Sequence, residues 1–256
     1  MNSLQLTAYK TLAKKEIIRI FRIWTQTLLP STITISLYFV IFGSFIGNRL
    51  GDFMSVPYMT FIIPGLIMLA IITNSFSNVA SAFFTAKFQR SLEEVLVSPV
   101  KPWIIVAGYV SGGVVRGACV SILVTIISLL FVPLKIYNIP LLVATTFLTA
   151  LLFSLMGLFN GIFSQRFDHV SLMPTFVLTP LTYLGGVFYS IDVLPRVWQT
   201  VSLFNPVLYL VNLMRFSFLG ISDISIIYSF FILFSCVTVM FMLCVYMIQK
   251  GIRIKS

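Results

Sequence analysis

The chain has 256 residues, of which 59% are hydrophobic, 15% are aromatic and only 9% are charged. Soluble domains carry about 25% charged residues, so this composition argues against a soluble protein. Runs without Asp, Glu, Lys or Arg cover Trp24 to Asn48, Phe53 to Ala86 and Val170 to Ile191. Each run is long enough to cross a hydrocarbon core of about 30 Å as a helix, and none shows the alternation of a barrel strand. An all-α integral membrane protein is therefore predicted.

Residues 1–23 are predicted to be an N-terminal cytoplasmic segment, and residues 24–256 a transmembrane domain. In the first segment apolar residues such as Leu12 alternate at helical spacing with basic ones such as Arg19. This pattern favours a helix in the membrane interface, facing anionic headgroups, over a solvated charged tail. Six spans are predicted, at about Thr25 to Ile46, Tyr58 to Phe84, Trp103 to Phe131, Pro140 to Phe163, Val170 to Tyr189 and Ile224 to Ile248.

The net charge of +10 is explained by membrane topology rather than by nucleic-acid binding, because Lys and Arg gather at the chain ends and between spans. With the N-terminus cytoplasmic, twelve of them lie inside: Lys10, Lys14, Lys15, Arg19, Arg22, Lys87, Arg90, Lys101, Arg166, Lys250, Arg253 and Lys255. Four lie outside: Arg49, Lys135, Arg196 and Arg215. This bias predicts that both termini are cytoplasmic.

Two connections are longer and more structured than a simple turn. Phe88 to Val100 reads FQRSLEEVLVSPV, in which Ser91 and Glu94 match an S-x-x-E capping box and Pro99 ends the segment. A capped cytoplasmic helix there would offer a surface to a partner. Ser190 to Asp223 mixes prolines and charges with apolar residues, which predicts short helices that re-enter the outer leaflet.

No catalytic site is predicted. The phosphate-binding pattern G-x-x-x-x-G-K-[ST] does not occur in the sequence, and the single His169 and seven acids form neither a catalytic set nor a metal cluster. Cys119, Cys236 and Cys244 lie in apolar runs and are interpreted as packing residues. The driving energy for any transport must therefore come from an ion gradient or from another polypeptide. Arg116, the one strong ionisable candidate within a span, either serves an ion pathway or has a structural role, in which it snorkels toward the interface or pairs with backbone carbonyls.

Two polar helix faces are candidates for lining a pathway. In the second span the face holds Asn74, Ser77, Asn78 and Ser81, and in the fifth it holds Thr175, Thr179 and Thr182, followed by Tyr183. Such faces either line a pathway or join helices by hydrogen bonds of about 0.6 kcal/mol each. Three GxxxG patterns, Gly43 with Gly47, Gly113 with Gly117 and Gly157 with Gly161, are interpreted as intramolecular packing sites.

Together these features resemble the ABC-2 type permeases, the membrane subunits of ATP-binding-cassette exporters. The likeness is strongest in FQRSLEEVLVSPV, in PTFVLTPLTYLGGVFYSIDVLP at Pro174 to Pro195, and in FNPVLYLVNLMRF at Phe204 to Phe216. The last stretch looks like the family signature near the final span, with Asn205, Pro206, Tyr209 and Arg215. The chain is most similar to Gram-negative inner-membrane transport permeases of unassigned substrate.

The resemblance implies that a separate cytoplasmic ATPase, with its ATP and Mg²⁺, drives export through a pair of permeases, expected to be a homodimer although a heterodimer stays open. It implies a coupling helix, formed by Phe88, Arg90, Ser91, Glu93, Glu94, Leu96 and Pro99, that docks on the ATPase. No cofactor, metal or nucleic acid is expected in this chain, and membrane lipid surrounds it. The alternatives are an ion-coupled carrier and a structural membrane protein. Asn74, Asn78, Thr179, Tyr183 and Phe188 suit an amphipathic or uncharged solute.

Overall fold

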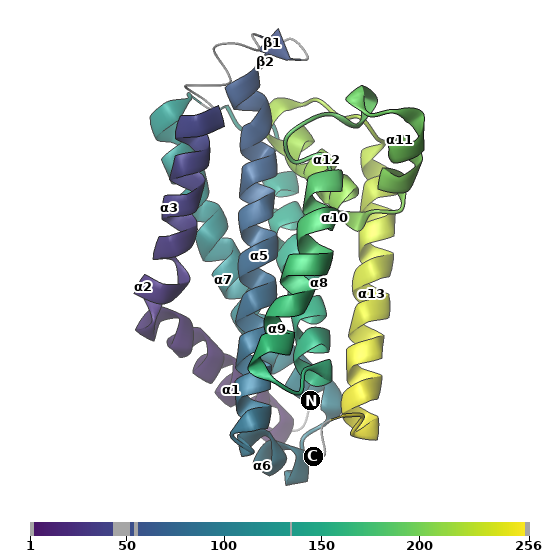
Figure 1. Ribbon diagram of the computed structural model, residues 1–256. Helices are drawn as coiled ribbons and strands as arrows, with labels where there is room; N and C mark the ends of the chain where they lie inside the picture. The colour runs from purple at the N-terminus through teal and green to yellow at the C-terminus, as the bar shows by residue number, and fades with distance from the viewer. Residues whose placement is uncertain (1–2, 43–51, 54–55, 134, 254–256) are drawn as a thin grey trace.

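The computed structural model describes residues 3–42, 52–53, 56–133 and 135–253. The chain forms an upright bundle of long helices (Figure 1). Its described strands are limited to a two-residue antiparallel ladder, in which β1 (Asp52–Phe53) pairs with β2 (Val56–Pro57) at one end of the bundle. The predicted all-α class is confirmed apart from this ladder.

The helices follow one another along the chain as α1 (Ser3–Arg22), α2 (Trp24–Thr27), α3 (Leu29–Tyr38), α5 (Tyr58–Phe88), α6 (Ser91–Val97), α7 (Pro102–Phe131), α8 (Ile139–Phe163), α9 (Phe167–Met173), the π-helical η2 (Pro174–Leu178), α10 (Thr179–Leu184), the 3-10 turn η3 (Ile191–Val193), α11 (Arg196–Leu203), α12 (Pro206–Leu219) and α13 (Ile226–Lys250). Within the described residues, five helical runs are long and apolar enough to cross a membrane: Trp24–Phe42, α5, α7, α8 and α13. The second, third, fourth and sixth predicted spans coincide with α5, α7, α8 and α13 to within a few residues. The first predicted span coincides with the run Trp24–Phe42, and its predicted end at Ile46 lies outside the described residues.

The fifth predicted span takes a less regular form. It is a continuous helical column of α9, η2 and α10, from Phe167 to Leu184, and it is not one of the five long apolar runs. Pro180 has no N–H to donate to the carbonyl four residues back. The wider π turn forms just before it, and there the Thr179 N–H bonds to Pro174 O. The prolines that the sequence places in this span therefore distort it without ending it.

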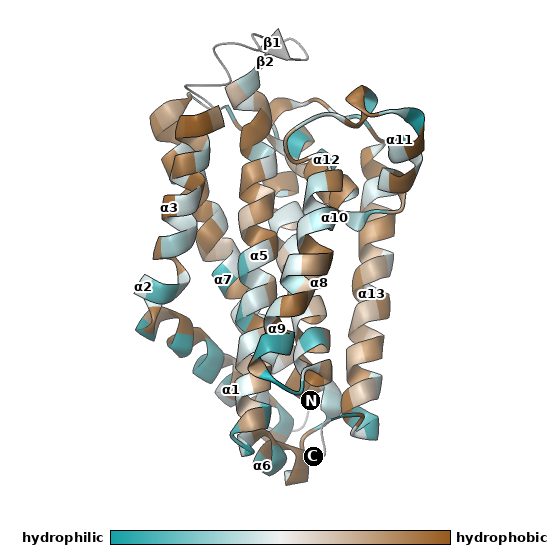
Figure 2. Cartoon of the chain, in the orientation of Figure 1, coloured by the Kyte–Doolittle hydropathy of each residue, from teal (hydrophilic) through white to brown (hydrophobic). Residues whose placement is uncertain are grey.

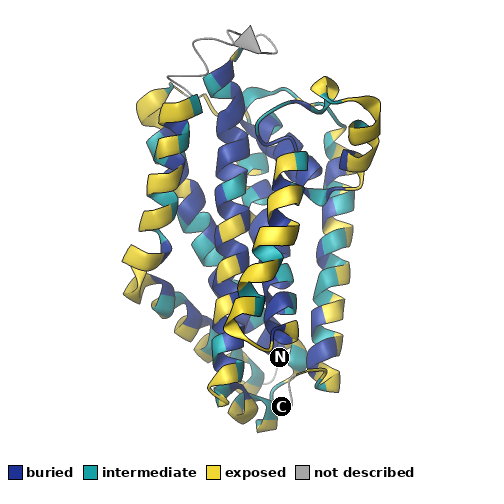
Figure 3. Cartoon of the chain, viewed as in Figure 1, coloured by how far each residue is buried: buried dark blue, intermediate teal, exposed yellow. Residues whose placement is uncertain are grey.

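Helix α5 is the centre of the bundle and packs against α7, α8 and α12. It is buried along most of its length, whereas the α9 to α10 column beside it is largely exposed (Figure 3). Glycines allow the close contacts: a Cβ on Gly157 would overlap the Phe76 backbone of α5, and one on Gly113 or Gly117 would overlap side chains of α5 and α8. These two GxxxG pairs are thus used within the chain, as expected, and the Gly43 pair lies outside the described residues.

The two described chain ends, Ser3 and Arg253, lie at the same end of the bundle, together with α6 (Figure 1). Polar residues gather at that end, along α1, α6 and α9, while the flanks of the long helices are mainly apolar (Figure 2). At the opposite end, α11 and α12 meet at an angle of 90°. The region predicted to hold short helices before the last span therefore does so, as a sharply bent pair.

Candidate functional site

A groove runs between α5 and the α9 to α10 column, with α3 along its other edge. Its upper part, of about 400 Å³, is lined by Pro30, Ser31, Thr34, Ile35, Tyr38, Leu69, Ala70, Thr73, Asn74, Ser77, Pro174, Thr175, Leu178, Thr179, Thr182 and Tyr183. Its lower part, of about 430 Å³, is lined by Phe76, Ser77, Ala80, Ser81, Phe84, Thr85, Arg116, Phe167, Val170, Ser171, Pro174 and Thr175. Ser77, Pro174 and Thr175 belong to both parts, so the two form one continuous groove.

The groove brings together all of the predicted pathway residues except Asn78. Asn74, Ser77, Thr175, Thr179, Thr182 and Tyr183 line its upper part, and Ser81 lines its lower part. Asn78 is buried instead, and its side-chain and backbone oxygens accept hydrogen bonds from Arg19 of α1. The placement of Asn78 on the groove face is corrected: a residue one turn from Asn74 and next to Ser77 points toward α1 rather than into the groove.

Several hydroxyl groups of the groove donate to carbonyls of their own helical column. Thr73 donates to Leu69 O at 2.9 Å, Thr175 to Ser171 O at 2.9 Å and Thr182 to Thr179 O at 2.8 Å. Their oxygen lone pairs remain available, so these side chains offer the groove mainly acceptors. Donors of hydrogen bonds to a solute must come from other side chains that line the groove.

Arg116 supplies such donors from α7. Its Nη2 donates to Asn74 Oδ1 at 2.8 Å and to Thr27 O at 3.0 Å, and its Nε donates to Asn74 Oδ1 at 3.2 Å. Arg116 therefore pairs with a backbone carbonyl, as one of the two sequence-based alternatives expects. The Asn74 side chain is its second partner. Among the described residues Arg116 has no acidic partner, because the two ion pairs found there involve other arginines.

A second polar cluster lies one turn further along α5, where α1 crosses the bundle. Glu16 is 4% exposed and forms an ion pair of 2.9 Å with Arg19, which also donates to Asn78. Burial raises the pKa of the Glu16 carboxyl, although nearby Arg19 and Lys15 oppose that rise. Gly112 of α7 leaves room for this side chain, since a Cβ there would lie 2.8 Å from Glu16 Cβ.

Aromatic rings close the groove at the end opposite the termini. Phe188 stacks on Phe42 with centroids 5.1 Å apart and on Tyr183 at 5.8 Å, and it meets Tyr38 edge-on at 6.2 Å. Tyr38 and Tyr183 also line the groove. The rings therefore join the α3 side of the groove to the α10 side.

Helix α6 is present over Ser91–Val97, but its predicted capping box is wrong. The N-cap is Arg90, in the left-handed conformation with φ 59°, and no side chain caps the helix. Ser91 is already inside the helix, where its hydroxyl donates to Ala86 O at 3.3 Å. The reason is that α5 continues to Phe88, so the chain must reverse at Arg90 itself.

The two faces of α6 differ. Leu92 is buried against the bundle, Leu96 is partly buried, and Glu93, Glu94 and Val97 are exposed. The segment that follows the helix is bound by Gln5 of α1. The Gln5 amide donates to Pro99 O at 2.8 Å, and its oxygen accepts from the Lys101 N–H at 3.1 Å.

Phe88, at the start of the α5 to α6 turn, links this end of the bundle to the groove. Its ring lies 5.0 Å from that of Phe167, the first residue of α9, and Phe167 lies 4.9 Å from Phe84 of α5. Phe84 and Phe167 both line the lower groove.

At the opposite end of the bundle, the four signature residues hold the bent pair of helices in place. Asn205 caps α12 by accepting from the Val207 N–H at 2.9 Å, and its amide donates to Leu181 O of α10 at 2.6 Å. Pro206 occupies the first turn of α12, where its missing N–H costs nothing. The Tyr209 hydroxyl donates to Leu203 O at 2.6 Å, which fixes α11 against α12.

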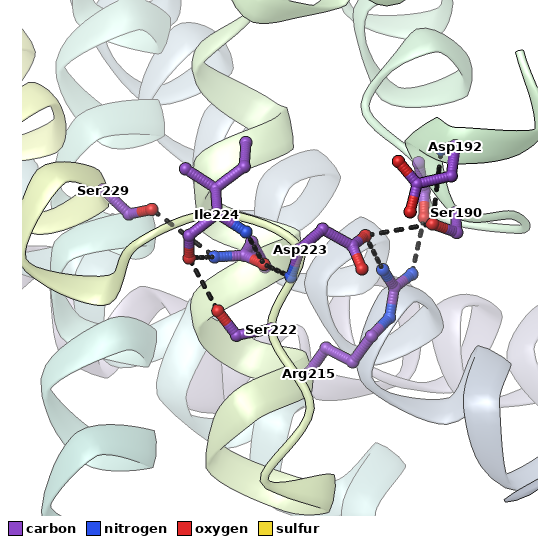
Figure 4. A network of polar contacts seen from close by, with 9 residues as sticks. Ser190, Asp192, Arg215, Ser222, Asp223, Ile224 and Ser229 are labelled. Atoms are coloured by element: carbon purple, nitrogen blue, oxygen red, sulfur yellow. Dashed lines mark hydrogen bonds and ion pairs between the residues drawn. The ribbon is translucent and has the colours of Figure 1, made fainter. Parts of the chain in front are cut away.

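Arg215 is the buried anchor of this region (Figure 4). It is 2% exposed, forms an ion pair of 3.2 Å with Asp223, donates to Gly186 O at 2.9 Å and stacks 4.0 Å over the Phe61 ring. Asp223 also accepts from Ser190 at 3.2 Å. The four residues therefore tie α10, α12 and the segment before α13 together. They do not line the groove.

Several residues of the site were not predicted as such. The α3 edge of the groove has no sequence-based assignment, although its polar residues Ser31, Thr34 and Tyr38 are spaced i, i+3 and i+7 and therefore share one helix face. Glu16 and Gln5 belong to the segment that is predicted to be an amphipathic helix, and the sequence pattern gives them no further role. A detectable signal for Glu16 was its place as the one acid in a segment that holds five basic residues.

Comparison with known proteins covers the whole chain. Residues 7–219 match the family model described as ABC-2 type transporter. The chain is 52% identical to the inner membrane transport permease YadH of Escherichia coli strain K12, over 256 residues and the full length of both proteins. It is 25% identical to nodulation protein J of Rhizobium leguminosarum bv. trifolii over 183 residues, which cover 70% of this chain and 68% of that protein. Nodulation protein J of Rhizobium meliloti strain 1021 is 22% identical over 183 residues, 70% of this chain and 68% of that protein.

Proposed function

Because the chain belongs to the ABC-2 type transporter family and is a multi-pass membrane transport component, we propose that it is the permease subunit of an exporter driven by a separate ATPase. Family membership is the observation that carries this proposal. The five long apolar runs contain no acidic residue, which disfavours coupling to a proton or sodium gradient. ATP and Mg²⁺ would be bound by the partner and not by this chain.

The proposed location is the bacterial inner membrane, with both termini in the cytoplasm. The relative YadH is named as an inner-membrane permease. The placement of both described chain ends at one end of the bundle agrees with the bias of basic residues toward that side. In this orientation α1 lies in the cytoplasmic interface, and the bent pair α11 and α12 re-enters the outer leaflet.

The proposed ATPase docking element is α6. The helix presents Glu93, Glu94 and Val97 to the cytoplasm, while Leu92 anchors it to the bundle. A displacement of α6 would be passed through Phe88 to Phe167 and so to the column that forms one wall of the groove. Nucleotide-driven closure of two ATPases would then shift the column and open the groove outward.

The proposed translocation pathway is the groove, completed by a second permease copy. The groove is only partly enclosed by this chain, and polar side chains of α5 and of the α9 to α10 column line it. A second copy of this chain, with its groove facing the first, would enclose a central cavity whose wall is formed by both grooves. The aromatic rings around Phe188 would close that cavity on the outer side until ATP binding separates α3 from α10.

Pull-down of the ATPase tests the docking role of α6. The tagged chain is extracted gently from membranes of its own host, and the copurifying ATPase is measured for the wild type and for Glu93→Ala combined with Glu94→Ala. We expect association to fall at least tenfold in the double variant and to stay normal in Asp168→Ala, which removes an exposed acid from α9 at the same end. Undiminished association in the double variant would remove the docking role from these two acids.

A further inference from the structure

The groove contains a positive charge that no acid of the described chain neutralises. Around the crossing of α1, α5 and α7 stand two arginines and one acid: Arg19 is paired with Glu16, and Arg116 is bound only by the neutral Asn74 amide and the Thr27 carbonyl. Their contacts on α5, Asn78 and Asn74, are one helical turn apart. An unneutralised charge within the hydrocarbon region is costly, and such residues in membrane proteins mark ligand or ion sites.

Arg116 also has unused donors. The guanidinium carries five N–H groups, and the hydrogen bonds within the described chain engage Nε and Nη2, so that Nη1 donates to none of these residues. Nη1 is not sealed in the protein interior either, and Arg116 lines the lower groove. Asn74 and Thr27 hold the group in one orientation, so the ordering cost of a guanidinium is already met before a ligand binds.

The surroundings of Arg116 are apolar on one side and polar on the other. Phe76, Phe84 and Val170 line the lower groove with it, while the exposed hydroxyl groups of Ser77 and Ser81 lie along the same wall. A ligand that satisfies both kinds of surface has a hydrocarbon portion and a compact polar head. An anionic head accepts charge-assisted hydrogen bonds from Arg116, which are about twice as strong as neutral ones.

We infer that the groove selects amphiphiles with an anionic head, such as a phosphate or carboxylate group, and that Arg116 is the residue that determines this selectivity. The inference names the substrate class of the proposed exporter and so rests on the proposed function, but binding itself requires no ATPase. It keeps the amphipathic alternative of the sequence-based expectation and replaces the uncharged one with a solute that has an anionic head.

Binding of three probes of equal chain length tests the inference on the full-length chain in phosphatidylcholine nanodiscs. The probes are radiolabelled dodecyl phosphate, dodecyl trimethylammonium and the neutral 1-O-dodecylglycerol, with protein-free nanodiscs measuring partition into the lipid alone. We expect dodecyl phosphate to bind about tenfold more tightly than the neutral probe, as one charge-assisted contact provides. Inorganic phosphate at the same concentration should not displace it, because it lacks the hydrocarbon portion.

Variants separate selectivity from a structural role. Arg116→Gln should abolish the preference for the anionic probe, Arg116→Lys should retain part of it, and Arg166→Gln, which removes one exposed charge outside the groove, should leave it intact. Equal binding of the anionic and neutral probes by the wild type would overturn the inference. So would an equal loss of both probes in Arg116→Gln, or full displacement by inorganic phosphate, which would indicate a site for soluble anions. Failure of the proposed function would appear separately, as a chain that binds dodecyl phosphate but copurifies with no ATPase.

Discussion

Arg116 of α7 and Asn74 of α5 are joined by two hydrogen bonds, of 2.8 and 3.2 Å, that converge on one amide oxygen. Asn74 is thereby both a wall of the groove and the acceptor that fixes a cation in it. Asn74→Ala should lower the free energy of unfolding by about 2 kcal/mol, because it leaves the Arg116 Nε without its acceptor and Nη2 with Thr27 O alone. Thermal unfolding in detergent measures this loss.

Asn74→Asp is the informative companion variant. Its carboxylate keeps an acceptor for Arg116 and neutralises the charge, so stability should exceed that of Asn74→Ala while the preference for dodecyl phosphate disappears. An Asn74→Ala variant as stable as the wild type would contradict the anchoring role of this amide.

The contact between Phe88 and Phe167 is expected to transmit ATP-driven movement of α6 to the α9 to α10 column. Phe167→Ala removes ring contacts with both Phe88 and Phe84, each worth about 1 kcal/mol, so ATP-driven movement of the column should fall about thirtyfold. The readout is ATP-dependent maleimide labelling of a cysteine introduced at exposed Ser171, in a background where the three native cysteines are serine.

The matched control is Phe176→Ala. Phe176 lies on the same column and is 71% exposed, so its removal should leave labelling unchanged. ATPase association should be normal in both variants, because neither residue belongs to α6. Normal ATP-dependent labelling in Phe167→Ala would show that movement reaches the groove by another route.

The buried ion pair between Arg215 and Asp223 predicts a large asymmetry between single and double variants. Asp223→Asn leaves Arg215, 2% exposed, without its counter-charge and should cost about 3–5 kcal/mol. Arg215→Met combined with Asp223→Asn should cost less than the sum of the two single changes. Thermal unfolding of the four-member cycle measures the coupling, with exposed Asp192→Asn as the control for loss of an acid in the same region. Additive losses would argue against a direct interaction.

Glu16 predicts a pH dependence of stability. Burial raises the pKa of its carboxyl above the ordinary value of 4.5, so the folded chain holds this proton more tightly than the unfolded chain. Stability from this group is therefore greatest below pH 4.5 and is lost as the pH rises through the raised pKa. The groups that face Glu16 are Arg19 and Lys15 on α1 and Tyr109 on α7.

Comparison with Glu16→Gln isolates this effect. The unfolding temperature of the wild type minus that of Glu16→Gln should decrease as the pH is raised from 4.5. The control is Glu93→Gln, at an exposed position: the unfolding temperature of the wild type minus that of this variant should stay constant over the same pH range. A difference that grows with pH would mean that the ion pair with Arg19 outweighs burial.

The spans were predictable because the apolar character of each run is summed over about 20 residues. A run such as Phe53 to Ala86 carries no charge, and no local detail alters the conclusion that it crosses a membrane. The bent pair before α13 was predictable for the same kind of reason, since prolines and charges interrupt an apolar stretch. The breaks within the fifth span were less predictable, because Pro174 and Pro180 are each compatible with a kink, a π turn or the end of the helix.

Which residues line the groove depends on the direction in which each side chain leaves its helix, and sequence spacing alone does not fix that direction. Ser77, Asn78 and Ser81 look like one polar stripe, yet Asn78 turns toward Arg19 while the two serines face the groove. Likewise Ser91 satisfies the capping-box pattern, but the position of the cap is decided by where α5 ends. The partners of Arg116 come from two other helices, and contacts so distant in sequence leave no local pattern.

The composition of the purified complex tests the central claim most directly. The tagged chain is isolated with its partners from membranes of its own host, and the particle mass and ATP hydrolysis are measured together. We expect two copies of this 28.8 kDa chain with two copies of one ATPase, and ATP hydrolysis that is lost with the α6 variants. A particle that contains this chain alone, hydrolyses no ATP and moves solute on an imposed ion gradient would contradict it.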